Sequence, residues 1–140
     1  MLLRRVAYYW LPVVLWMAVI LGLSSQSNLP QRTDPSTGER IGATYSLAKT
    51  WHVIEYSLLS LLIFRAAHGH GGGLKLRPAR AAGFAVVTCL VFAGLDELRQ
   101  SFVPRREASI NDVLLDTAAA FIAAAACAMW IQSRGRARSV

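Results

Sequence analysis

Three long apolar stretches limit the folds that this chain can adopt. Residues 6–23 and 81–95 carry no charge, and residues 113–131 carry a single acid, Asp116. Apolar stretches of roughly 20 residues match the thickness of a bilayer's hydrocarbon core. Only 16% of the residues are charged, against about 25% in soluble domains, so a membrane protein is favoured. The length of 140 residues fits a single domain.

The first apolar stretch follows Arg4 and Arg5, an arrangement that secretory signal peptides share. We interpret it as a spanning helix over about 6–24, because the run exceeds a signal core and no A-x-A cleavage site follows. Further helices are expected over about 46–67, 81–102 and 110–131. Residues 1–140 then form one all-α membrane domain with four transmembrane helices. The polar residues 24–45 are expected to form a solvated loop, with a substrate-covering flap as the alternative.

The bases and acids predict a topology for these four spans. With a cytoplasmic N-terminus, nine of the fifteen bases lie on the cytoplasmic side and all eight acids lie on the other. This distribution agrees with the positive-inside rule. We therefore expect a multi-pass protein of the plasma (inner) membrane with both termini in the cytoplasm. The net charge of +7 is therefore weak evidence for a nucleic-acid partner, and none is expected. Cys89 and Cys127 lie within apolar runs, so we infer no disulfide.

The expected second helix carries an unusual set of polar residues in its first half. At about 100° per residue, Lys49, His52 and Tyr56 share one face, and Glu55 lies beside them. Ionisable side chains in a spanning helix normally face the bundle interior or a watery cavity, where they are functional candidates. Lys49 alone could instead extend toward the membrane surface.

A dense polar segment, residues 96–112, separates the last two apolar stretches. Asp96 and Glu97 lie near a helix C-terminus, where acids oppose the macrodipole by roughly 0.3–1 kcal/mol each, so partners are expected. Gln100 shares a face with Asp96, and Lys49, Arg105 or Arg106 could neutralise an acid across the bundle.

The last helix is expected to start with Ser109 as its N-cap and Asp112 three residues later. Capping alone would account for Asp112. Asp116, one turn further, has no such explanation, and two acids at i,i+4 repel unless they are paired or protonated. The alanine-rich remainder predicts close helix packing, and the same surface would also suit a homodimer.

These segments bring their polar residues near one membrane face. The predicted ligand-binding set is Lys49, His52, Glu55, Tyr56, Asp96, Glu97, Gln100, Arg106, Ser109, Asp112 and Asp116. A metal held by His52, Glu55 and acids of the last two helices is a minor alternative, and a flexible H-x-H at His68 and His70 is weaker still. No metal or cofactor is predicted.

The motifs in this set are similar to those of the VanZ-like family. They are S-S-Q-S after the first helix, K-x-x-H-x-x-E-Y at 49–56, D-E-L-x-Q-x-F-x-P-x-R at 96–106, and S-x-x-D-x-x-x-D at 109–116. The resemblance implies a small four-helix integral membrane protein, associated in some members with resistance to glycopeptide antibiotics, notably teicoplanin. The chain departs from the family where Pro104-Arg105-Arg106 replaces P-G-R, and where Asp116 and Ala119-Ala120 replace Asn and then Gly.

Three functions remain open at this point. The cluster could bind the anionic head group of a membrane lipid or lipid-linked cell-wall precursor, with Lys49 and Arg106 contacting phosphate. It could be an enzyme acting on a lipid, with His52 as general base oriented by Glu55 or Asp96. It could also be a buried ion-pair network that only specifies helix packing.

Overall fold

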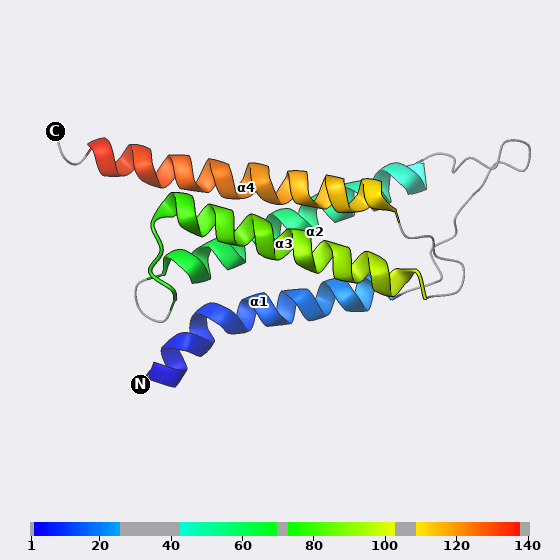
Figure 1. Ribbon diagram of the computed structural model, residues 1–140, viewed down its shortest axis with the longest axis horizontal. Helices are drawn as coiled ribbons and strands as arrows, with labels where there is room; N and C mark the ends of the chain where they lie inside the picture. The colour runs from blue at the N-terminus through cyan, green and yellow to red at the C-terminus, as the bar shows by residue number, and fades with distance from the viewer. Residues whose placement is uncertain (1, 26–42, 70–72, 103–108, 138–140) are drawn as a thin grey trace, which may run out of the picture.

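The described part of the chain consists of four helices that run alternately up and down (Figure 1). They are α1 (Leu2–Ser24), α2 (Ala43–His68), α3 (Pro78–Gln100) and α4 (Ile110–Ala137). The structure, a computed structural model, describes residues 2–25, 43–69, 73–102 and 109–137, with the backbone alone for residues 2 and 43–48. Both chain ends lie at the same end of the bundle.

The helices extend beyond several of the expected boundaries. α1 already includes Arg4 and Arg5, and α4 continues through Arg134 and Arg136, because the backbone hydrogen bonds of a helix do not stop where apolar residues do. α3 begins at Pro78, which suits a first helical position because it has no N–H to satisfy. It ends at Gln100, two residues before the expected boundary.

Small side chains form the contact between α2, α3 and α4, as the alanine-rich sequence of α4 predicts. Ala120 and Ala124 of α4 are fully buried, and so are Ala85 and Ala93 of α3. The hydroxyl of Ser60 donates a 2.8 Å hydrogen bond to the carbonyl of Ala120, linking α2 directly to α4. Without long side chains between them, the helix backbones approach closely.

α1 is attached to one side of this three-helix unit. It packs mainly on α2, touches α3 little and makes no close contact with α4 in the described residues. The indole N–H of Trp16 donates to the carbonyl of Glu55 at 2.9 Å. At the other end, the guanidinium of Arg65 lies over the rings of Tyr8 and Tyr9.

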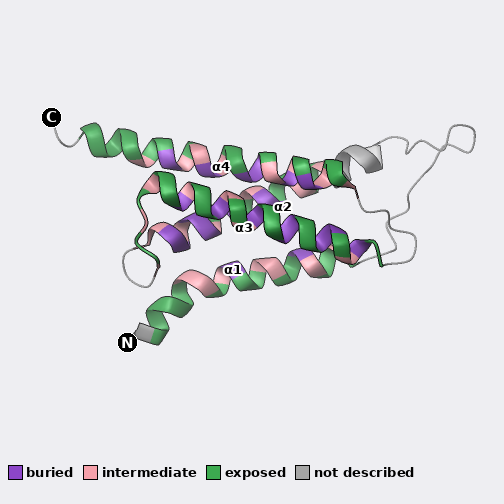
Figure 2. Cartoon of the chain, viewed as in Figure 1, coloured by how far each residue is buried: buried purple, intermediate pink, exposed green. Residues whose placement is uncertain are grey.

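The outer surface of the bundle is largely apolar, and exposed residues follow the outward faces of the helices (Figure 2). By length and composition, three helices could cross a membrane, namely α1, α3 and α4. The fourth expected span, α2, is not among them. Its polar residues lower its mean hydropathy, although Glu55, Tyr56 and Ser60 are buried against its neighbours rather than turned outward.

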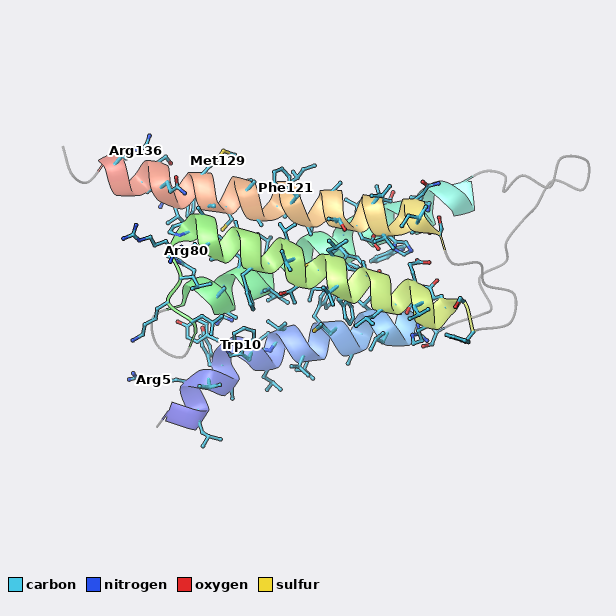
Figure 3. All side chains as sticks on the ribbon, in the orientation of Figure 1. Arg5, Trp10, Arg80, Phe121, Met129 and Arg136 are labelled. Atoms are coloured by element: carbon cyan, nitrogen blue, oxygen red, sulfur yellow. The ribbon has the colours of Figure 1, made fainter. Side chains whose placement is uncertain are left out.

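The described charges are separated between the two ends of the bundle. We call the end with the chain termini the basic end. It carries Arg4, Arg5, Arg65, Lys75, Arg77, Arg80, Arg134 and Arg136, and no acid among the described residues. Arg5, Arg80 and Arg136 can be seen there in Figure 3. The opposite end, which we call the polar end, carries all the described acids.

Candidate functional site

Two charge pairs connect α2 to α4 at the polar end. Lys49 forms an ion pair with Asp112, and Nδ1 of His52 lies 3.2 Å from the carboxylate of Asp116. α2 and α4 run in the same direction, so bases three residues apart on one helix meet acids four residues apart on the other. Each acid therefore has a partner, which removes the repulsion expected for Asp112 and Asp116 at i,i+4.

A second group surrounds Asp96 and joins α3 to the end of α1. The amide of Gln100 donates to one carboxylate oxygen of Asp96 at 2.9 Å, as their i,i+4 spacing predicts. The other oxygen accepts 2.9 Å hydrogen bonds from the Ser24 hydroxyl and from the Arg99 guanidinium. Arg99 also donates to the hydroxyls of Ser24 and Ser25. The buried carboxylate of Asp96 thus holds the Arg99 guanidinium and the C-terminal end of α1 together.

Glu97 accepts a hydrogen bond from the start of α4. Its carboxylate accepts a 2.8 Å hydrogen bond from the backbone N–H of Ser109. In a capping box this N–H would go to the side chain at the third helical position, which here is Asp112. Because Glu97 takes the N–H and Asp112 pairs with Lys49, capping by itself does not account for Asp112.

Glu55 and Tyr56 lie between the two groups. Both side chains are buried, and the ring of Tyr56 packs against Phe92 of α3 at a centroid distance of 6.2 Å. Glu55 lies among His52, Asp116 and Asp96, where the histidine attracts its carboxylate and the two acids repel it.

In each of these three pairs, Lys49–Asp112, His52–Asp116 and Arg99–Asp96, the base is more exposed than the acid. The side-chain exposures are 26% for Lys49 against 14% for Asp112, 20% for His52 against 2% for Asp116, and 35% for Arg99 against 3% for Asp96. Asp96 and Asp116 are buried, and Asp112 is less exposed than the Lys49 that it contacts. The site therefore exposes more of its positive than of its negative groups.

The structure brings together the predicted site residues that it describes. Arg106 lies outside the described residues, and the other ten gather at the polar end. The prediction did not include Ser24, Ser25 and Arg99. The i,i+3 spacing of Asp96 and Arg99 on one helix could have predicted their ion pair. Ser24 and Ser25 belong to the S-S-Q-S motif, but nothing in the neighbouring sequence indicated that they contact α3.

The carboxylate that contacts His52 comes from Asp116, whereas Glu55 and Asp96 were the expected orienting groups. An imidazole held at Nδ1 by a carboxylate keeps its other nitrogen available for proton transfer. Among the described residues, no group of three or more His, Cys, Asp or Glu side chains is placed to hold a metal ion. His68 instead bonds through Nδ1 to the carbonyl of Leu76 at 2.8 Å, a contact that shapes the turn between α2 and α3.

Comparison with known proteins identifies the family. No curated protein and no solved structure matches the chain. A family model described as VanZ/LLP1 matches residues 9–131, which include all eleven predicted site residues as well as Ser24, Ser25 and Arg99. The match extends over well more than half of the sequence and agrees with the resemblance carried by the motifs. The chain therefore belongs to the VanZ/LLP1 family.

Proposed function

We propose that this protein is a four-span inner-membrane protein whose polar end faces the extracytoplasmic side and binds an anionic lipid head group. The ligand would be a membrane lipid or a lipid-linked cell-wall precursor, and the role would be in the cell-envelope or glycopeptide-antibiotic response. The separation of described charges supports the orientation, because bases concentrate on cytoplasmic ends. α2 serves as the fourth span because Glu55, Tyr56 and Ser60 are buried and because Lys49, His52 and Ser60 have polar partners on α4.

The observation that carries the proposal is that each base of these pairs is more exposed than its acid. Lys49, His52 and Arg99 are partly exposed at the polar end, and each contacts a less exposed carboxylate, that of Asp112, Asp116 or Asp96. A phosphate approaching from the membrane surface would meet the positive charge of the Lys49 ammonium and of the Arg99 guanidinium, which its carboxylate and serine contacts hold in place. The carboxylates offset part of the positive charge of the bases. A ligand would therefore be recognised by the positions of the bases as well as by its own negative charge.

A binding measurement on the purified protein tests this proposal. The probes are a polyprenyl phosphate, chosen as a lipid phosphate monoester, and the polyprenol without its phosphate. The variant Lys49→Gln/Asp112→Asn replaces the ion pair with a neutral pair of similar shape, and we expect it to weaken binding of the phosphate at least tenfold. The control Arg80→Gln, at the basic end, should bind as the unaltered protein does. Equal binding of phosphate and alcohol by the unaltered protein would contradict the proposal.

The contact of His52 with Asp116 favours a second candidate, an enzyme acting on a lipid ester or phosphoester. A carboxylate-held imidazole is the arrangement of a general base. Turnover of a lipid substrate by purified protein, lost in His52→Gln at normal abundance, would support this candidate. Saturable binding without product would favour the first.

A role in the envelope response can be tested in the native host. Single alanine replacements of His52, Asp96, Arg106 and Asp112 would be scored for membrane abundance and for survival with teicoplanin. Normal abundance with lost survival indicates a functional site. A fall in abundance for all four indicates an ion-pair network that serves packing.

A further inference from the structure

At the basic end, two guanidinium groups lie over aromatic rings. Arg134 lies 4.1 Å from the ring centre of Trp130, and Arg65 lies 4.4 Å and 4.9 Å from the ring centres of Tyr8 and Tyr9. Tyr8 and Trp130 are largely exposed, at 66% and 55%. Exposed aromatic rings near helix ends lie at the depth of lipid head groups, so their arginines are held at the same depth. Contact with a ring orients a guanidinium without neutralising it.

The described residues of this end include no acid that could pair with Arg65 or Arg134. The hydrogen bond of Arg65 at this site goes to the backbone carbonyl of Tyr8 at 3.3 Å, a neutral acceptor. Arg65 is only half-exposed, and a charge near the hydrocarbon boundary is costly unless a counter-ion approaches it. Arg77 and Arg80, exposed at the start of α3, add further positive charge at the same end.

We propose that the basic end is a second binding site, specific for anionic phospholipid head groups of the surrounding leaflet. The guanidinium groups of Arg65 and Arg134 can each receive a lipid phosphate, because the planar fork of donors matches two phosphate oxygens. Tyr8, Tyr9 and Trp130 keep these groups at head-group depth. Arg77 and Arg80 attract the negative charge at longer range. The site is independent of the ligand proposed for the polar end and lies at the opposite end of the bundle.

The test compares phosphatidylglycerol with phosphatidylcholine of the same acyl chains, bound to the full-length protein in micelles and counted by native mass spectrometry. The unaltered protein should prefer phosphatidylglycerol. The variant Arg77→Gln/Arg80→Gln/Arg134→Gln changes exposed side chains only. Each base near an anionic surface contributes a factor of about five, so the three should weaken phosphatidylglycerol binding roughly a hundredfold. Arg65→Lys keeps the charge but loses the planar fork, and should weaken binding by less.

The control Lys49→Gln/Asp112→Asn at the polar end should retain the phosphatidylglycerol binding that the triple arginine variant loses. This separates the two sites, because each variant changes one end only. Equal binding of the two lipids by the unaltered protein would overturn the inference. The inference would also be overturned if the triple arginine variant bound phosphatidylglycerol as tightly as the unaltered protein, regardless of the result for the polar-end variant.

Discussion

Nδ1 of His52 lies 3.2 Å from the carboxylate of Asp116, although 64 residues separate them in the sequence. The pair lies one turn below the ion pair of Lys49 with Asp112, on the same two parallel helices. Further along the helices, Ser60 donates to Ala120, so α2 and α4 are connected at three successive levels. Any relative shift of the two helices by one turn would separate all three.

Removing His52 should destabilise the bundle more than neutralising the whole pair. His52→Ala leaves the buried carboxylate of Asp116 without its partner, and breaking a buried pair in this way costs about 3–5 kcal/mol. His52→Gln/Asp116→Asn should cost clearly less, because neither side chain is then charged. Reversible unfolding in mixed micelles measures both values. Equal losses would show that the two side chains do not act as a pair.

Exchanging the charges of Lys49 and Asp112 should preserve the protein where either single change does not. Lys49→Asp or Asp112→Lys alone places like charges in contact, and a loss of 1–2 kcal/mol lowers cellular abundance about severalfold. The double exchange restores an attractive pair and should recover most of the abundance, as measured by quantitative immunoblotting of membranes. No recovery would mean that the position of each charge, and not their pairing, is what matters.

Ala124→Leu should disrupt the packing of α4, whereas Ala126→Leu should not. Ala124 is fully buried, while Ala126 is exposed on the same helix. Extra methylene groups in a packed interface cost about 1–3 kcal/mol, but a leucine on the outer surface only adds apolar area toward lipid. Thermal unfolding in detergent compares the two variants directly. Similar melting temperatures would contradict the observed orientation of α4.

Gly73→Ala should destabilise the turn between α2 and α3. A Cβ at this position would clash with the backbone carbonyl oxygen of Ala66, which also accepts a hydrogen bond from the N–H of Leu74. Because a backbone atom cannot rotate away, the turn itself must move, and a loss of about 1–3 kcal/mol is expected. Gly94→Ala is the matched control, since nothing lies within 4 Å of its added Cβ. We expect it to be neutral or slightly stabilising in the same unfolding measurement.

Much of the local structure could be predicted from the sequence because helices and membrane spans depend on neighbouring residues. The three apolar stretches predicted α1, α3 and α4, and the apolar second half of residues 46–67 supported α2. The i,i+4 spacing of Asp96 and Gln100 predicted their hydrogen bond. Hydropathy does not mark α2 as a span, because it counts polar residues without regard to the direction in which they face.

The partners across helices could not be predicted in the same way. Asp116 rather than Glu55 contacts His52, Glu97 rather than Asp112 takes the N–H of Ser109, and Ser24 of α1 reaches Asp96 of α3. Each contact depends on how far a helix is rotated and shifted along its axis. A shift of one residue rotates a helical position by about 100°, so small differences in packing change the partner completely.

By itself, the sequence determined that this protein is helical and apolar, and that its polar residues lie at one end opposite most of its bases. Local hydropathy and helix periodicity are sufficient for those features. Only the tertiary structure decided that the bases at the polar end are more exposed than the acids that they contact, and that Arg65 of α2 lies over the rings of Tyr8 and Tyr9 of α1 at the basic end. Those relationships follow from the close approach of α2, α3 and α4 through small side chains, and from the attachment of α1 beside them, neither of which is encoded in any single segment.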